Sequence, residues 1–348
     1  MLNKFYKMFS NDIGIDLGTA NTLVYLKGHG IVVNEPSVVV VNKKTGQIIA
    51  IGASAKVMLG RTPGHVRAVR PVVDGVISDF EVTEEMLSYL IGKAEKMASK
   101  PIRPRVVIGV PTGITNVEIR AVEDAALSAG AREVYIIEEP MAAAVGIRLP
   151  VKDAVGSVIV DIGGGTTDVA VISMSGVVRS KNLKIAGDML NNDIINYMKE
   201  EFKLLIGERT AESVKIAIGA VIATDSLEAE VRGRDMVTGL PRQVIVTDSD
   251  IREAIMPSIL DLVDGIKEVL ETTPPELLSD IIHRGLVLSG GGALLRGLDS
   301  FLQGHLKIPV YIADDPLTAV ARGTGVVLDE FETYKEVLIN TEDASISR

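Results

Sequence analysis

Two segments of the chain share one construction. Each has an apolar strand, an aspartate, a turn rich in glycine and hydroxyl or amide side chains, and a second apolar strand: residues 12–26 read DIGIDLGTANTLVYL, and residues 158–172 read VIVDIGGGTTDVAVI. The two aspartates, Asp16 and Asp161, are separated by about one domain length. A repeat at this spacing predicts two related domains that face each other, each presenting one turn to a shared ligand.

The second turn has two explanations. A tight hairpin uses glycine because glycine adopts positive φ at little cost. Three glycines in a row, Gly163, Gly164 and Gly165, are more than a hairpin requires, since each adds conformational entropy to the unfolded chain. Consecutive residues without Cβ also let backbone N–H groups approach an anion closely. This segment alone leaves both explanations open, and its recurrence near Gly18 favours phosphate binding.

Composition excludes several classes of function. The 348 residues suffice for two α/β domains, and with 47% hydrophobic and 24% charged residues the chain is predicted to be globular. A net charge of −10 argues against a nucleic-acid partner. The absence of cysteine excludes disulfides and thiolate chemistry, and the four histidines form no HExxH zinc pattern. No apolar run approaches the length of about 18 residues that spans a membrane, and no signal-peptide core is present, so we expect a cytoplasmic protein.

Strand and helix patterns alternate along the chain, which predicts sheets covered by helices. A helix from Thr115 is expected because Glu118 follows at the spacing of a capping box. A polar hairpin is expected at 228–248. Further strands are expected at 31–42, 47–52, 104–111, 134–140, 286–292 and 310–314, and helices at 83–99 (apolar face Met86, Leu87, Leu90, Ile91 and Met97), 115–129, 141–147, 187–206, 210–224, 249–270 and 321–331.

A third glycine turn, SGGGALLRGL at 289–298, opens what is predicted to be a helix. Alone it is typical of an ordinary loop between a strand and a helix. Near a nucleotide, glycine at a helix start would let a flat base or an α-phosphate lie on the backbone. The chain contains neither a GxxxxGK[ST] phosphate loop nor a GxGxxG turn, so a bound nucleotide requires another device.

Five motifs carry a resemblance to a known family. IGIDLGTANT, VIGVP, EEPMAAAVG, DIGGGTTD and LSGGGALLRGLD occur in the order of the phosphate 1, connect 1, phosphate 2 and adenosine motifs. The chain therefore resembles the superfamily of actin, Hsp70 and hexokinase. Within it, NDIGIDLGTANTLVY and NEPSVVVV are similar to the MreB family of bacterial actins, and the resemblance spans nearly the whole chain.

The resemblance implies an α/β actin-like ATPase fold. Two lobes of related topology, each a mixed sheet flanked by helices and each with a smaller subdomain, would hold MgATP between them. The expected bounds are 11–152 for lobe I, with its small subdomain at about 34–72, and 153–348 for lobe II, with its small subdomain at about 187–248.

The resemblance also implies roles for individual residues. Asp16 and Asp161 are expected beside a Mg²⁺ ion, through water, and Glu139 and Asp161 beside the attacking water. Glu139 has a second explanation, a surface carboxylate before the proline that ends a strand. Glu212 and Lys215, in RTAESVK, resemble the adenosine-contacting pair in the Hsp70 pattern RTACERAK. The implied nucleotide contacts are Thr19, Ala20, Asn21, Gly163, Gly164, Gly165, Thr166, Glu212, Lys215, Gly291, Gly292 and Ala293.

The first nine residues, MLNKFYKMF, precede the first strand. Their apolar side chains follow one stripe of a helix, and their only charges are positive, which suits an anionic membrane surface. The alternatives are a frayed terminus or a segment packed on the core. Many members of the MreB family bind membrane through such a segment, so the candidate membrane-binding residues of this stretch, 1–10, are Met1, Leu2, Lys4, Phe5, Lys7, Met8 and Phe9.

The resemblance implies a cytoplasmic, peripherally membrane-associated filament that hydrolyses ATP slowly and maintains rod shape by organising peptidoglycan synthesis. Its implied partners are further copies of itself, in antiparallel double protofilaments, the inner face of the membrane and the cell-wall elongation machinery. An Hsp70-like chaperone is disfavoured because about 25 residues follow ARGTGVV, which leaves no room for a peptide-binding domain. A small-molecule kinase of the superfamily would need an acceptor site, and no insertion supplies one.

Overall fold

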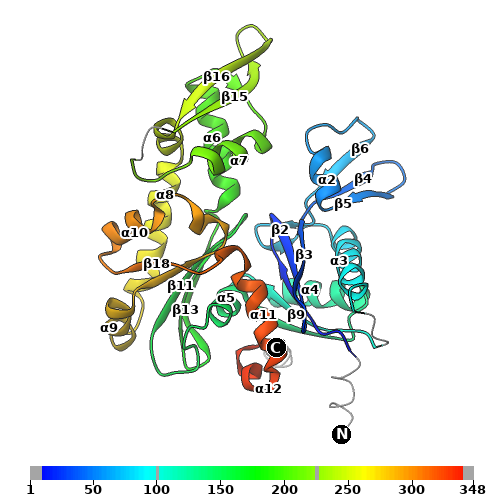
Figure 1. Ribbon diagram of the computed structural model, residues 1–348, viewed down its shortest axis with the longest axis vertical. Coiled ribbons are helices and arrows are strands. Elements are labelled where there is room, and N and C mark those ends of the chain that lie inside the picture. The colour runs from blue at the N-terminus through cyan, green and yellow to red at the C-terminus, as the bar shows by residue number, and fades with distance from the viewer. Residues whose placement is uncertain (1–9, 99–101, 224–226, 340–348) are drawn as a thin grey trace.

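A computed structural model of the chain describes residues 10–98, 102–223 and 227–339. Two five-stranded sheets form the centres of two lobes (Figure 1). The sheet of lobe I has the order β10-β9-β1-β2-β3, and its strands are β1 (Ile13–Leu17), β2 (Asn21–Leu26), β3 (Gly30–Pro36), β9 (Arg105–Val110) and β10 (Glu133–Glu138). The sheet of lobe II has the order β13-β12-β11-β17-β18, and its strands are β11 (Ser157–Ile162), β12 (Thr167–Ser173), β13 (Gly176–Leu183), β17 (Leu286–Ser289) and β18 (Val310–Ile312).

The two sheets have the same topology. In each, the first strand pairs antiparallel with the second and the second with the third, while the two remaining strands run parallel to the first. Asp16 near the end of β1 and Asp161 near the end of β11 occupy equivalent positions, each directly before its turn. The related lobes predicted from the repeated motif are therefore confirmed.

Helices cover the outer faces of both sheets, and α4 begins as predicted. Thr115 accepts from the Glu118 N–H, and the Glu118 carboxylate accepts from the Thr115 N–H, which completes the capping box. The helices concerned are α3 (Phe80–Glu95) and α4 (Asn116–Ser128) in lobe I, and α8 (Asp248–Glu271), α9 (Pro275–Arg284) and α10 (Leu298–Leu306) in lobe II.

Three predicted helix ends were wrong for local reasons. Helix α3 begins three residues earlier than expected because the Asp79 side chain caps it by accepting from the Val82 N–H. It ends at Glu95, so Met97 is 58% exposed and is not part of the apolar face. The helix expected at 187–206 ends at Glu200, since Lys203 has a positive φ and β14 (Leu204–Leu205) then pairs with β15.

The small parts of each lobe lie toward one end of the molecule (Figure 1). In lobe I they are β4 (Val39–Asn42), β5 (Ile48–Ile51), α2 (Ala53–Met58), β6 (Val66–Val69), β7 (Val72–Val73) and β8 (Val76–Ile77). In lobe II they are α6 (Gly187–Glu200), β14, α7 (Glu208–Ile218), β15 (Glu228–Asp235) and β16 (Pro241–Thr247). Strands β15 and β16 form the polar hairpin that the sequence predicts.

Helices α5 (Glu139–Gly146) and α11 (Ala319–Asp329) lie between the two sheets (Figure 1). They share a buried apolar core with Val107 of lobe I and Ile159 of lobe II. Their backbones approach so closely that a Cβ on Gly146 would lie 2.1 Å from the Ala319 carbonyl oxygen. This crossing joins the two lobes.

The remaining short elements lie in the third glycine turn, directly before α11 and directly after α11. They are η1 (Gly291–Leu294), η2 (Pro316–Thr318), α12 (Phe331–Tyr334) and η3 (Lys335–Val337). No helix in the described ranges is both long enough and apolar enough to cross a membrane.

The helix crossing predicts the effect of adding one methyl group. A Cβ on Gly323 would lie 1.7 Å from the Ala142 carbonyl oxygen, so Gly323→Ala must push α5 and α11 apart. We expect the free energy of unfolding to fall by about 2–3 kcal/mol, measured by urea denaturation. Gly92→Ala in α3 is the matched control, because its Cβ would meet nothing within 4 Å. Alanine there should stabilise the helix by about 0.5–1 kcal/mol. If Gly323→Ala and Gly92→Ala were equally stable, α5 and α11 could move apart at no cost, which would contradict this prediction.

Candidate functional site

A cavity of about 530 Å³ lies between the lobes, a size typical of small-molecule sites. Every predicted nucleotide and metal residue lines it except one. The predicted lining residues are Asp16, Thr19, Ala20, Asn21, Glu139, Asp161, Gly163, Gly164, Gly165, Thr166, Glu212, Lys215, Gly291 and Gly292. Ala293 is fully buried and is not part of the lining. The candidate membrane residues within 1–9 lie outside the described residues.

The two turns face each other directly across the cavity. A Cβ on Gly164 would lie 2.6 Å from the Cβ of Ala20, and a Cβ on Gly165 would lie 2.6 Å from Oγ1 of Thr19. None of the three glycines at 163–165 has a positive φ. Gly164 and Gly165 are therefore required because the turn of the other lobe approaches them, and not because a hairpin needs a left-handed residue.

The backbone of these turns is suited to binding an anion. Within the described parts of the chain, the N–H groups of Thr19, Ala20, Gly164 and Gly165 have no acceptor. The Gly164 carbonyl, in contrast to its N–H, is paired: it accepts from the Asp188 N–H at 2.8 Å. This bond connects the second turn to the start of α6. Donors left unpaired at a cavity wall favour an anionic ligand such as phosphate, because a buried N–H without a partner is costly.

Carboxylates gather at the same end of the cavity. Asp161 is 6% exposed, and its Oδ1 has no hydrogen-bond partner in the described ranges. Burial, reinforced by the charge of Asp161, raises the pKa of Asp16 to about 8. Burial likewise raises the pKa of Asp161 to about 7 and that of Glu139 well above its usual range. Carboxylates held this close together call for a cation between or beside them.

Glu139 is held by the fold and is not a surface residue. It is the first residue of α5, directly after β10, and is 8% exposed. The helix here begins two residues earlier than the sequence predicts, with Pro140 in its first turn. The alternative of a surface carboxylate is therefore wrong, and Glu139 faces the cavity beside the turns.

The carboxylates fit a hydrated magnesium ion better than a directly ligated metal. Within 10–98, 102–223 and 227–339, no three His, Asp or Glu side chains converge on one metal position. Mg²⁺ commonly keeps several waters and takes its other ligands from one or two carboxylates and from the phosphates of a substrate. Asp16 and Asp161 would serve such an ion from opposite lobes.

The other end of the cavity is apolar and suits a flat base. Ile216 of α7, Leu294 of η1 and Leu317 of η2 line it and are 69%, 54% and 50% exposed. The third glycine turn leads into the short helix η1, and not directly into the longer helix that the sequence predicts. A Cβ on Gly292 would lie 2.2 Å from Cγ2 of Ile162, so packing on β11 also requires this glycine.

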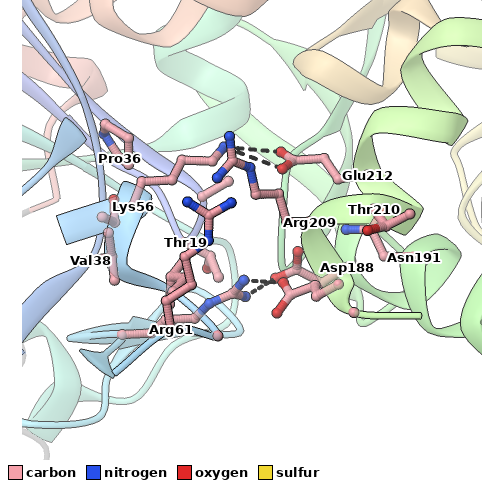
Figure 2. A pocket seen from close by; sticks show the side chains of 17 residues that line it. Thr19, Pro36, Val38, Lys56, Arg61, Asp188, Asn191, Arg209, Thr210 and Glu212 are labelled. Carbon is pink, nitrogen blue, oxygen red and sulfur yellow. Dashed lines mark hydrogen bonds and ion pairs between the residues drawn. The ribbon is translucent and has the colours of Figure 1, made fainter. Parts of the chain in front are cut away.

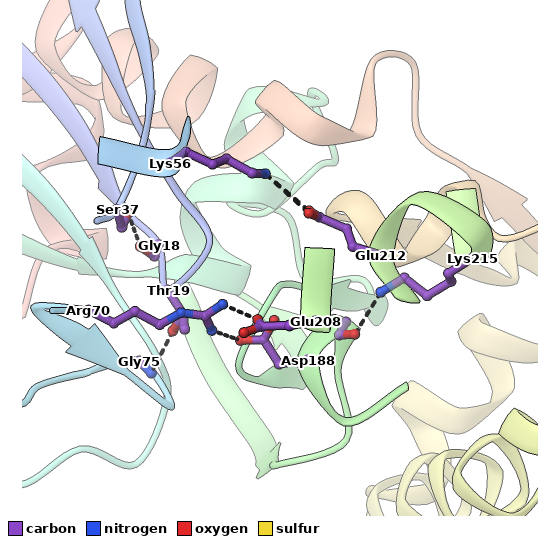
Figure 3. Close-up of polar contacts among 11 residues, drawn as sticks. Gly18, Thr19, Ser37, Lys56, Arg70, Gly75, Asp188, Glu208, Glu212 and Lys215 are labelled. Carbon is purple, nitrogen blue, oxygen red and sulfur yellow. Dashed lines mark hydrogen bonds and ion pairs between the residues drawn. The ribbon is translucent and has the colours of Figure 1, made fainter. Parts of the chain in front are cut away.

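The predicted pair on α7 has further contacts that the sequence did not indicate. Lys215 donates to the Gly187 carbonyl at 2.6 Å, and burial lowers the pKa of its ammonium. Glu212 forms an ion pair of 3.2 Å with Lys56, which comes from α2 in lobe I (Figure 3). The pair therefore lies where the small parts of the two lobes meet.

More ion pairs connect the lobes beside this cavity. Arg70 of lobe I bonds both Asp188, at 2.7 Å, and Glu208 (Figure 3). They border a second hollow of about 410 Å³, into which Arg61 and Arg209 extend from opposite lobes (Figure 2). Sequence reasoning missed all of these residues, because charged partners more than a hundred positions apart leave no periodic signal.

The carboxylates make the stability of the ligand-free protein depend on pH. The pKa values of Asp16 and Asp161 are raised from 3.8 to about 8 and about 7, so the folded state binds more protons than the unfolded state in this window. Stability is therefore lost as pH rises. We expect the free energy of unfolding to fall by roughly 4 kcal/mol between about pH 6 and about pH 8.5.

Urea denaturation of the protein without nucleotide or metal measures this dependence. Asp16→Asn should reduce this dependence by more than half, because the amide does not titrate while Asp161 still does. Stability that rises over the same pH range would contradict the assignment of these carboxyl groups.

Comparison with known proteins places the chain in a family. A family model described as MreB/Mbl protein matches residues 10–336. The cell shape-determining protein Mbl of Bacillus subtilis (strain 168) is 51% identical over 328 residues, which cover 93% of this chain and 98% of that protein. The cell shape-determining protein MreB of Escherichia coli (strain K12) is 51% identical over 347 residues, which cover 98% and 100%.

A solved structure agrees with the architecture. MreB5 of Spiroplasma citri bound to ADP matches with a TM-score of 0.89 and 38% identity, over 94% of this chain and 98% of that one. The same protein bound to AMPPNP matches with a TM-score of 0.88, 37% identity and the same coverage. The two equivalent sheets with a cavity between them are thus an actin-like fold, and the chain belongs to the MreB/Mbl family.

Proposed function

We propose that this chain is a slow, Mg²⁺-dependent ATPase whose hydrolysis is coupled to filament assembly. The observation that carries the proposal is the pair of turns facing each other across the cavity, with unpaired N–H groups on both and raised-pKa carboxylates beside them. The similar MreB5 binds ADP and AMPPNP, which supports a nucleotide in the same place.

The geometry suits phosphoryl transfer to water. The N–H groups of Thr19, Ala20, Gly164 and Gly165 would hold phosphate oxygens from both sides. A hydrated Mg²⁺ held near Asp16 and Asp161, when bound, neutralises charge on the phosphates. Glu139, whose pKa is raised by burial, would orient the water and accept its proton. Glu139 is buried at the start of α5, which keeps its carboxylate in one position.

The apolar end of the cavity would hold the base. Ile216, Leu294 and Leu317 offer it an apolar surface, while Gly291 and Gly292 would let it approach the backbone. Glu212 and Lys215 would contact the ribose and the base from α7. Ala293 would support the turn from beneath, since its side chain is fully buried.

The cellular function proposed is that of a cytoskeletal filament. ATP would close the two lobes, 11–152 and 153–348, and the closed form would assemble, because a ligand shifts an equilibrium toward the form it binds more tightly. The related MreB and Mbl proteins are cell shape-determining proteins. By that relationship we infer a membrane-bound filament of antiparallel double protofilaments, on the cytoplasmic face of the membrane, that organises peptidoglycan synthesis and maintains rod shape.

Attachment of the filament to the membrane would depend on many weak contacts, one from each copy of the chain. The apolar and basic stripe at residues 1–9 is too short to bind lipid strongly alone. A filament that presents many copies would bind through avidity. Relatives that cover 93–98% of this chain are shape-determining proteins and neither chaperones nor sugar kinases, which favours this proposal over those alternatives.

Replacing Glu139 tests the proposed chemistry. Glu139→Ala and Glu139→Gln should keep ATP binding but slow phosphate release by about 100-fold or more, because the group that orients the water is lost. Nucleotide affinity is measured by fluorescent-nucleotide titration and turnover by phosphate release. Glu133→Ala, on the exposed start of β10, is the control and should hydrolyse ATP normally. Unchanged turnover in both Glu139 variants would remove this residue from the mechanism.

High-speed pelleting with anionic liposomes tests assembly and membrane binding together. The wild type should pellet with lipid in MgATP and show filaments by electron microscopy, whereas Asp161→Ala should do neither because the cation is lost. The chain without residues 1–9 should assemble yet stay off the liposomes. Phosphate release should need no sugar and should rise with protein concentration, unlike that of a kinase. If the protein binds ATP but stays monomeric under all of these conditions, it shares the fold of the MreB/Mbl family but not the proposed assembly.

A further inference from the structure

Asp168 is a buried carboxylate that the proposed mechanism does not use. It lies on β12, opposite Asp161 in the antiparallel pair β11–β12, and is 1% exposed. It does not line the cavity between the lobes. A buried carboxylate needs strong partners, so the identity of those partners indicates its role.

Its partners come from both lobes. Oδ1 of Asp168 accepts from the Thr112 N–H at 2.8 Å and from the Thr112 hydroxyl at 2.5 Å. The Asn182 amide lies 3.1 Å from both carboxylate oxygens. Asn182 belongs to β13 of the same sheet, but Thr112 follows β9 in lobe I and is 2% exposed. Asp168 therefore bonds the end of a lobe I strand to lobe II.

A chain of contacts leads from this bond to the phosphate turns. Pro111, next to Thr112, lies so close to Gly75 that a Cβ on Gly75 would be 2.3 Å from its Cγ. The Gly75 N–H donates to Oγ1 of Thr19 at 3.1 Å (Figure 3). Thr19 in turn contacts Gly165 of the opposite turn. The position of Thr112 is thus transmitted to both turns through packed neighbours.

Glu139 lies on the same framework. Strand β10 pairs in parallel with β9, with Glu138 beside Val110, and Glu139 follows directly. A shift at the end of β9 would therefore move Glu139 and the first turn together, relative to the second turn.

We propose that Asp168 is a positioning residue for ATP hydrolysis, which fixes the end of β9 against lobe II so that both phosphate turns and Glu139 keep one geometry. This inference rests on the proposed function. Its bond to Thr112 links the angle between the lobes to the site where the phosphates would lie. Loss of the bond should affect the reacting geometry more than nucleotide affinity, because the N–H groups that hold phosphate remain.

Three substitutions separate this role from simple packing. Thr112→Val keeps the shape and the N–H but removes the hydroxyl, whereas Thr112→Ser keeps the hydroxyl. Asp168→Asn keeps the shape but removes the charge that strengthens the bonds from Thr112, and its amide group would oppose the amide of Asn182. Thr112→Val and Asp168→Asn should lower kcat at least about tenfold with KM for ATP changed less than about threefold, while Thr112→Ser should stay within about twofold of the wild type. The double variant should be little worse than the poorer single variant, since both substitutions act on the same interaction between Thr112 and Asp168.

A second measurement does not depend on catalysis. The chain contains no cysteine, so Val57→Cys on α2 and Ile245→Cys on β16, which are 58% and 63% exposed, accept one spin label on each lobe. Electron–electron double resonance should show a broader distribution of distances between the lobes in Thr112→Val and Asp168→Asn, restored in Thr112→Ser.

The outcomes distinguish this inference from the proposed function. Wild-type distances and kcat in Thr112→Val would overturn the inference, as would lower stability with unchanged distances. If Asp168→Asn does not fold, Thr112→Val alone decides. If the wild type does not hydrolyse ATP, the proposed function fails, and the distance measurement still tests whether Asp168 fixes the lobes.

Discussion

The site depends on the close crossing of α5 and α11. Gly146 and Gly323 carry no Cβ, so the backbones of the two helices come into contact where any side chain would clash. Both helices share one apolar core with the sheets of both lobes, including Val107 and Ile159, so the lobes are held at a defined separation. At a slightly larger separation the two turns would not meet, because Gly164 and Gly165 contact the opposite turn with no space to spare. Close packing thus sets the width of the site.

The electrostatics of this site are unfavourable until a ligand compensates them. Burial raises the pKa of Asp16, Asp161 and Glu139 together, so folding disfavours the charged form of each of these carboxyl groups. Perturbed carboxylates of this kind gather at functional sites, where a cation or a proton transfer makes use of them. Unpaired N–H groups on the facing turns give the opposite polarity in the same cavity. A phosphate chain with a cation would compensate the N–H groups and the carboxyl groups at once.

Much of the fold could be predicted from the sequence, and all but one of the predicted nucleotide and metal residues line the cavity, although many of its other lining residues were not predicted. The repeated motif indicated two related sheets, and Thr115 with Glu118 indicated the start of α4, because these signals are local. Helix ends were less predictable: the Asp79 cap and the positive φ of Lys203 moved them by several residues. Of the two explanations for the glycines at 163–165, the hairpin that needs positive φ is wrong, and the contact of Gly164 and Gly165 with the other lobe is a further reason that the sequence did not indicate. Ala293 belongs to the predicted turn but lies behind the cavity wall.

By itself, then, the sequence determined which residues form the turns, because strand, aspartate and glycine follow one another within a few positions and their order is visible without a fold. The tertiary structure alone decided which of those residues meet. The pairing of Arg70 with Asp188, and of Thr112 with Asp168, joins side chains that are far apart in the chain. In an unfolded chain, each of these carboxylates could accept hydrogen bonds from many different donors. Only when the helix crossing fixes the lobes do these particular partners come within hydrogen-bonding distance, because hydrogen bonds act over a few ångströms and the chain alone sets no such distance.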